Sequence, residues 1–356
     1  MKSLNTHARS LVLALVLLLL PLVLQPFGNA WIRIVDMALI YVLLALGLNI
    51  VVGFAGLLDL GFVAFFAIGA YAYAFLASPQ LLESWGWLQQ HFPDGLHTPW
   101  WLVMPISIVL TGIFGVLLGA PTLKLRGDYL AIVTLGFGEI IRVFMNNLDQ
   151  PLNITNGPKG IGAIDPIQIA GHSLAKKLDW MGLEFKSVTL YYYLFLCTVI
   201  LAVVICHRLQ HSRIGRAWMA IREDEVAAQA MGLNTRNLKL LAFSLGATFG
   251  GVAGSFFAAF QQFISPESCG LMESVMVVAM VVLGGAGHLP GVILGALLLA
   301  ILPEALRYVA TPLQDLSGGR IDAAILRQLL IALTMVLAML WRPQGLWPKH
   351  PQGVKT

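Results

Sequence analysis

Long apolar runs separated by short polar segments dominate the chain, and each run has about the length of a membrane-spanning helix. A bilayer core of ~30 Å requires about 20 mainly apolar residues in helical form. Ten runs meet this requirement, at 10–26, 34–53, 58–77, 99–120, 128–146, 189–206, 238–260, 272–290, 291–311 and 322–341. The pattern predicts an all-α polytopic membrane protein, a bundle of about ten transmembrane helices forming one transmembrane domain over residues 1–356.

Two places in this pattern leave alternatives open. The first run follows a basic start (Lys2, Arg9) and precedes Gly28, which fits a cleavable signal peptide as well as a retained anchor. We expect retention, because a multispanning protein can use its first helix as an anchor. The eighth and ninth runs are separated only by Gly-Gly-Ala-Gly-His-Leu-Pro-Gly at 284–291, which fits a tight turn or a re-entrant segment.

Composition excludes a soluble domain and indicates the orientation. The chain is 58% hydrophobic and 11% charged, whereas soluble domains carry roughly 25% charged residues. The segment 207–237 holds five arginines, while the loop 78–98 holds neither Lys nor Arg. Because cytoplasmic loops collect positive charge, 207–237 and both termini are expected in the cytoplasm. The loop 147–188 is then periplasmic, and its four lysines do not oppose this, since long loops cross largely regardless of charge.

A short amphipathic helix is predicted inside 207–237, where the chain has the spacing E-x-A-A-x-x-x-G. Asp224 can cap its N-terminus, where Glu223 and Glu225 add further acidic groups. Gly232 can end it in a left-handed conformation, and Asn234 or Thr235 can cap the next helix. One face carries a small apolar stripe, formed by Val226, Ala227, Ala230 and Met231. Such a helix is small enough on that face to fit a groove in another protein.

Charged residues within the runs are costly at membrane depth and therefore indicate function or pairing. Glu139 and Arg142 are three residues apart, as are Glu304 and Arg307, so each pair can lie on one helix face. Either these pairs only hold helices together, or Glu139 and Arg142 lie near a polar path for a zwitterionic solute. Asp36 and Asp59 lie near the ends of their runs, and we expect them at the interface.

Glycines divide several runs. Gly250 and Gly254 have the small-xxx-small spacing that lets helices approach closely. The interruption at 48–56, Leu-Asn-Ile-Val-Val-Gly-Phe-Ala-Gly, fits either tight packing or a locally unwound helix of the kind found in transporters.

No pattern of an enzyme is persuasive. The chain lacks the G-x-x-x-x-G-K-[ST] phosphate loop, a G-x-S-x-G elbow and a metal-spaced group of cysteines. The cysteines, Cys197, Cys206 and Cys269, are expected to be inert and buried. We therefore predict no catalytic residue, no metal site and no cofactor in this chain.

Several motifs together resemble one family. They are the segments 45–49 (ALGLN), 53–61 (GFAGLLDLG), 125–142 (LRGDYLAIVTLGFGEIIR), 156–160 (NGPKG), 214–225 (IGRAWMAIREDE), 264–268 (ISPES) and 280–287 (MVVLGGAG). With the E-x-A-A-x-x-x-G helix, they make the chain similar to LivM-type permease subunits of branched-chain amino acid ABC importers. The likeness covers most of the chain from about 40 to 311.

The resemblance implies an inner-membrane permease of a bacterial importer. It implies four partner chains: a second, LivH-like permease, two cytoplasmic ATPase subunits and a periplasmic amino-acid-binding protein. Leucine, isoleucine and valine are the implied solutes, and ATP hydrolysis belongs to the partner chains. The family's ATPase-coupling positions map onto Arg222, Glu223, Asp224, Glu225, Ala227, Ala228 and Gly232. Val226 departs from the family pattern, in which alanine is common.

Two alternatives stay open. The chain fits an ABC permease for another small solute such as urea. A secondary transporter is the other alternative, although it would usually show ionisable groups along an ion path and inverted repeats. Neither feature is evident in the sequence.

Overall fold

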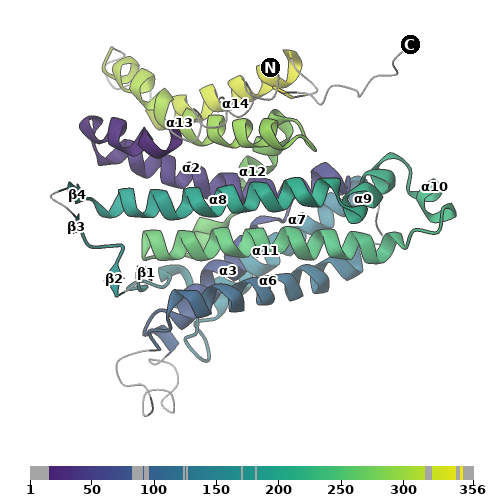
Figure 1. Ribbon diagram of the computed structural model, residues 1–356, viewed down its shortest axis with the longest axis horizontal. Helices are drawn as coiled ribbons and strands as arrows, with labels where there is room; N and C mark the ends of the chain where they lie inside the picture. The colour runs from purple at the N-terminus through teal and green to yellow at the C-terminus, as the bar shows by residue number, and fades with distance from the viewer. Residues whose placement is uncertain are drawn as a thin grey trace, which may run out of the picture.

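Helices run side by side along the long axis of the molecule in the computed structural model (Figure 1). The structure describes residues 16–81, 91, 96–122, 125, 127–169, 171–180, 183–316, 323–341 and 345–347. The long helices are α2 (Asn29–Leu48), α3 (Val63–Leu76), α6 (Trp100–Thr122), α7 (Asp128–Asn147), α8 (Ser187–His211), α11 (Thr235–Gln261), α12 (Leu271–Gly284), α13 (Leu289–Leu316) and α14 (Ala323–Trp341). This architecture confirms the all-α prediction.

Short elements lie at the two ends of the long axis (Figure 1). At one end, β1 (Gln168–Ile169) pairs antiparallel with β2 (His172–Ser173), and β3 (Leu178–Trp180) pairs antiparallel with β4 (Leu183–Phe185). At the other end lie the short helices α9 (Arg213–Glu223) and α10 (Glu225–Ala230). The remaining short elements are η1 (Gln25–Phe27), η2 (Asn49–Phe54), η3 (Gly157–Lys159) and η4 (Pro266–Cys269).

Six helical segments among the described residues are long and apolar enough to cross a membrane. They are Asn29–Phe54, Trp100–Thr122, Ser187–His211, Thr235–Gln261, Pro266–Gly284 and Leu289–Arg307. Large apolar side chains are also exposed along α6, α7 and α8, such as Trp101, Ile132 and Leu201, as expected where lipid replaces water. The polytopic membrane character is therefore confirmed, but the predicted count of about ten spans is not. The run 10–26 lies partly outside the described residues.

The centre of the bundle is a close contact between α11 and its neighbours α3 and α6. A Cβ atom on Gly254 would lie 2.0 Å from the carbonyl oxygen of Phe66, and one on Gly69 would lie 2.2 Å from that of Gly251. The Ser255 hydroxyl lies 2.8 Å from that of Ser107 and donates to the Gly69 carbonyl at 3.1 Å. Small residues are therefore required here, which is the close packing that the Gly250–Gly254 spacing predicts.

The interruption at 48–56 is a helix break. α2 ends in the π-helical turn η2, and Gly56 then adopts φ +70°. The chain stays outside a helix until α3 begins at Val63. The helix is therefore shorter than the predicted span 58–77. A specific contact holds the non-helical backbone: Leu60 N donates to Thr134 Oγ1 at 3.1 Å, and a Cβ on Gly61 would collide with the Thr134 carbonyl. The chain is therefore helical to Phe54 and non-helical from Ala55 to Phe62, where it passes α7.

The segment 284–291 is a tight turn between α12 and α13. Gly285 and Gly287 adopt φ +103° and +91°, values that favour glycine. Gly287 N donates to Asn49 Oδ1 at 2.8 Å, which joins this turn to η2. Two interruptions that are more than 200 residues apart in the sequence thus meet in the fold.

Candidate functional site

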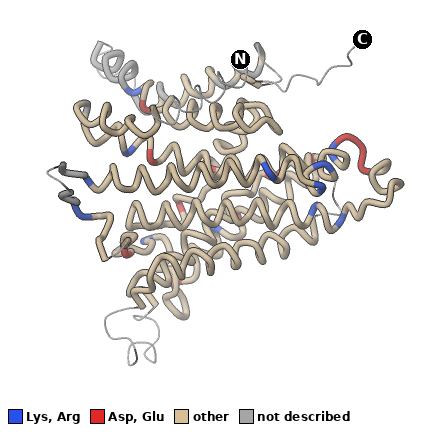
Figure 2. Tube along the Cα trace, in the orientation of Figure 1, with Lys and Arg blue, Asp and Glu red and all other residues tan. Residues whose placement is uncertain are grey.

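The segment predicted as the loop 207–237 is mostly helical and extends past the ends of the long helices. α8 continues to His211, and Ser212 caps α9 by accepting a hydrogen bond from Gly215 N at 3.1 Å. α10 lies at the tip, beyond the ends of α8 and α11 (Figure 1). Lys, Arg, Asp and Glu gather around α9 and α10, while most of the helical length between the two ends is uncharged (Figure 2).

Local side chains fix the ends of α10. Asp224 Oδ1 accepts hydrogen bonds from Val226 N at 2.8 Å and Ala227 N at 3.0 Å. Gly232 has φ +84°, and a Cβ there would meet no atom within 4 Å, so the position is constrained by conformation and not by space. Asn234 caps α11 by accepting from Asn237 N at 3.1 Å. These three features have the conformations that the sequence predicts.

An apolar face of α10 is open to its surroundings. Val226 is 64% exposed and Met231 84% exposed, and Ala227 and Ala230 are exposed beside them. We call these four residues the docking face. Ala228, by contrast, is 4% exposed and turned toward the protein, so it does not belong to this face. A change at Ala228 would first disturb the packing of α10 itself.

Arg222 connects α9 to the helix break in α2. Its guanidinium Nη1 donates to the Gly53 carbonyl in η2. A Cβ on Gly56 would lie 2.7 Å from Arg222 Cγ, and one on Gly287 would lie 2.8 Å from Arg222 Nη1. Arg222 therefore touches both η2 and the turn between α12 and α13. Sequence reasoning placed Arg222 in the coupling segment but could not find these partners.

Two further contacts fix α9 and α10 to the start of α11. Lys239 Nζ lies 2.6 Å from Glu225 Oε1, with side chains that are 6% and 22% exposed. The buried Trp218 donates from Nε1 to the Leu238 carbonyl at 2.7 Å. Sequence reasoning missed Lys239 and Trp218. A cation in the first turns of an apolar span was the available signal, because it is expensive there without a partner.

The charged pair on α7 forms as predicted and has an additional partner. Arg142 Nε lies 2.9 Å from Glu139 Oε2, and Arg142 Nη1 lies 3.3 Å from Glu267 in η4. The space next to Glu139, between α7, α12 and the Leu60–Gly61 backbone, has a volume of only about 10 Å³. Glu304 and Arg307 also pair, at 3.0 Å.

One expectation about a single residue is wrong: Cys197 is not buried. Asp36 and Asp59 are both buried in the bundle. Asp59 Oδ1 accepts a hydrogen bond from Gly61 N at 2.9 Å, so the buried Asp59 carboxylate holds the non-helical segment before α3. Cys197 is exposed, whereas Cys206 and Cys269 are buried as expected. In the part of the chain that the structure describes, no group of three or more His, Cys, Asp or Glu residues could hold a metal ion.

Comparisons with known proteins point to one family. Residues 31–339 match the family described as "Branched-chain amino acid transport system / permease component". The chain is 40% identical over 350 residues to the high-affinity branched-chain amino acid transport system permease protein LivM of Escherichia coli K12, covering 94% of this chain and 75% of the relative. It is 27% identical over 314 residues to LivH of the same organism, covering 85% and 92%.

A more distant relative is the probable LivM permease protein of Methanocaldococcus jannaschii, 26% identical over 254 residues, covering 70% of this chain and 69% of the relative. No solved structure matches the chain.

Proposed function

Since the chain belongs to the family of branched-chain amino acid transport system permease components, we propose that it carries leucine, isoleucine and valine across the bacterial inner membrane. The observation that carries this proposal beyond the family is the docking face. It is an exposed apolar surface on a short helix, held outside the bundle by side-chain contacts and not buried by any part of the chain that the structure describes. Such a surface is typical of a contact with another protein.

The partners follow from the same reasoning. The chain resembles both LivM and LivH, two permease proteins named for the same transport system in one organism. We therefore propose that it pairs with a LivH-like chain and that the pair forms the solute path. Two ATPase subunits would bind the docking faces from the cytoplasm, and a periplasmic binding protein would deliver the solute at the β1–β4 end.

The proposed topology keeps ten spans with both termini in the cytoplasm. Six spans are evident by length and apolarity, and α3, α7, α14 and the first run would supply the other four. Arginines around α9 favour a cytoplasmic position for this end of the molecule.

Arg222 connects the docking face mechanically to the bundle. If an ATPase moves α10, α9 moves with it, because Asp224 directly joins the two helices. Arg222 then transmits the displacement to η2 and to the turn at 285–288. A helix break and a glycine turn can change conformation at lower cost than a continuous helix, so this junction is where the bundle would switch between its two openings.

The ion pair of Glu139 and Arg142 has a structural role in this proposal. Arg142 joins α7 to η4 by pairing with Glu267 as well as with Glu139, and the adjoining space holds at most about one water molecule. A path for an amino acid needs more room than this.

Uptake of radiolabelled leucine, isoleucine and valine tests the proposal in cells with and without the gene. We expect loss of uptake without the gene, and restoration by the wild-type gene but not by Gly232→Asp, which puts a negative charge at the C-terminal end of α10, next to Met231 of the docking face. Urea is the control solute. Unchanged amino acid uptake, with loss of urea uptake, would contradict the solute assignment and leave a permease for urea.

Arg222→Met tests the route from the docking face. The variant keeps an unbranched apolar stem but removes the donor to Gly53. We expect normal assembly with the ATPase subunits and uptake reduced about tenfold, the loss of a hydrogen bond from a charged group. Uptake at the wild-type rate would contradict the proposed route without affecting the solute assignment.

A further inference from the structure

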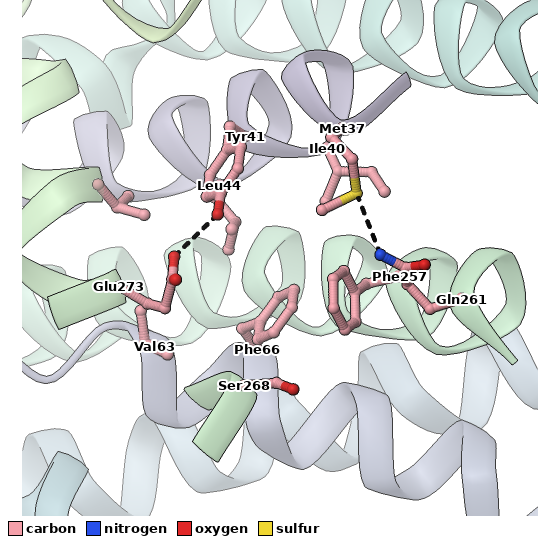
Figure 3. Close-up of a pocket in the computed structure, with 11 residues that line it drawn as sticks. Met37, Ile40, Tyr41, Leu44, Val63, Phe66, Phe257, Gln261, Ser268 and Glu273 are labelled. Atoms are coloured by element: carbon pink, nitrogen blue, oxygen red, sulfur yellow. Dashed lines mark hydrogen bonds between the residues drawn. The ribbon is translucent and has the colours of Figure 1, made fainter. Parts of the chain in front are cut away.

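A cavity of about 220 Å³ lies where α11 ends and α12 begins, enclosed by these helices together with α2, α3 and η4 (Figure 3). One water molecule needs roughly 10–15 Å³ by the same kind of measure, so the cavity has room for a small organic solute. It lies away from α9 and α10, because Phe257 and Gln261 belong to the last turns of α11.

One side of the cavity carries a carboxylate without a cationic partner among the described residues. The Tyr41 hydroxyl donates to Glu273 Oε2 at 2.8 Å, and the two side chains point toward each other in Figure 3. The ion pairs of the described residues involve other acids. A carboxylate can accept about four hydrogen bonds, so Glu273 retains capacity for an ammonium group.

Hydrogen-bond donors lie on another part of the wall. The Gln261 amide Nε2 donates to Met37 Sδ at 3.9 Å, and sulfur is a weak acceptor that a stronger one can replace. The Gln261 oxygen accepts from the Arg33 guanidinium, which holds the amide in this orientation. The Ser268 hydroxyl also lies on the wall, 3.2 Å from the Ser265 hydroxyl. It can donate to a ligand when the Ser265 hydroxyl donates to it. These groups suit the carboxylate of a small zwitterion.

The rest of the wall is aliphatic and aromatic. Val63 and Phe66 come from α3, Phe257 from α11 and Val277 from α12. An apolar side chain placed against them would leave water, which is favourable, whereas a second charged group would lose its hydration without a partner. The wall therefore discriminates between solutes by their side chains.

From this arrangement we propose that the cavity is a transient site for an amino acid with an aliphatic side chain. The ammonium group binds Glu273, the carboxylate binds Gln261 and Ser268, and the side chain packs against Phe66 and Phe257. The proposal rests on the proposed transport of amino acids and names where this chain contacts them. A solute that has no cationic group and no apolar chain, such as urea, would gain little here.

The Tyr41–Glu273 hydrogen bond could instead serve only to join α2 to α12, and two variants separate these roles. Glu273→Gln keeps an oxygen acceptor for Tyr41 but removes the negative charge. Tyr41→Phe removes the hydrogen bond but keeps the charge. In the assembled transporter in proteoliposomes, we expect maximal leucine uptake to fall at least ~tenfold in Glu273→Gln, which loses an ammonium–carboxylate bond. Tyr41→Phe should lower it by only about threefold.

Photoaffinity labelling with a diazirine analogue of leucine gives a readout that does not depend on turnover. We expect label on peptides that contain Phe66 or Phe257, competition by excess leucine but not by urea, and loss of label in Glu273→Gln.

Equal uptake defects in the two variants, or unchanged labelling in Glu273→Gln, would overturn the site and leave a structural hydrogen bond. Absence of leucine uptake by the wild-type transporter would instead contradict the proposed function.

Discussion

The two ends of the long axis differ in how they present their side chains. At the α9–α10 end, an apolar face is exposed on a helix of six residues, and a few specific contacts attach it to the bundle. Toward the β1–β4 end, polar and apolar side chains enclose a cavity, and helices from distant parts of the chain form its walls. The first arrangement suits a protein partner and the second suits a small solute.

Under the proposed function, this difference would separate the coupling of energy from the selection of solute. Changes at the docking face should affect transport of every solute equally, because they act before any solute contact. Changes in the cavity wall should alter which solute passes. The closely packed centre of α3, α6 and α11 lies between these regions, so a change there should affect both properties.

A charge on the docking face should have the largest effect. Met231→Glu places a carboxylate where an apolar groove of the ATPase would receive a thioether. We expect uptake to fall roughly 100-fold or more, with unchanged folding because Met231 is exposed. The measurement is leucine uptake, normalised to the amount of permease in the membrane. Met231→Leu is the matched control and should transport normally; equal uptake by both variants would contradict a docking role.

Loss of the buried ion pair should loosen α10 without touching the cavity. Glu225→Gln leaves the Lys239 ammonium, which is almost fully buried, without its anionic partner. We expect a loss of stability of about 3 kcal/mol and a similar fractional loss of leucine, isoleucine and valine uptake. Thermal unfolding of the purified protein checks the first, and parallel uptake assays check the second. An uptake defect for only one of the three solutes would contradict the separation of roles between the two ends.

Addition of one methyl group in the centre should affect both ends together. Gly254→Ala places a Cβ 2.0 Å from the Phe66 carbonyl oxygen and forces α3 and α11 apart. We expect about 2 kcal/mol of destabilisation, measured by thermal unfolding, together with lower uptake. Gly136→Ala is the matched control, because a Cβ at Gly136 meets no atom within 4 Å. If the two variants behave alike, close packing does not limit the centre.

The smallest effect is expected from backbone conformation at the end of α10. Gly232 has φ +84°, which asparagine tolerates better than a β-branched residue does. We expect Gly232→Val to cost about 1 kcal/mol more than Gly232→Asn and to transport less well. The unfolding temperatures of the two variants, measured together with their leucine uptake, check this expectation. The reverse order would show that size matters at this position more than conformation.

Local chemistry made the docking end largely predictable from the sequence. Asp224, Gly232 and Asn234 act on backbone groups within three residues or on their own φ angle, so their spacing alone indicated where α10 begins and ends. Ala228, one of the coupling positions that the resemblance implies, is buried against the protein. Its burial was not predictable, because helical periodicity does not say which neighbour covers a face.

Long-range contacts were beyond the reach of the sequence. Arg222 and Gly53 are 169 residues apart, and Tyr41 and Glu273 are 232 residues apart. No periodicity in a single chain brings such residues together. The break at 48–56 was foreseen as one of two options. The contacts of Asn49 with the turn at 285–288, and of Leu60 with Thr134, depend on how the helices pack. The same reason explains why α3 is shorter than its apolar run.

Site-specific photo-crosslinking at Met231 tests the central claim most directly. A photoreactive amino acid would replace Met231 in the full transporter in intact membranes, with Leu152 at the opposite end as the control position. We predict that Met231 crosslinks to a cytoplasmic ATPase subunit and that Leu152 does not. Crosslinking of Met231 to lipid or to a periplasmic protein, with no ATPase product, would contradict the assignment of α10 as the coupling helix.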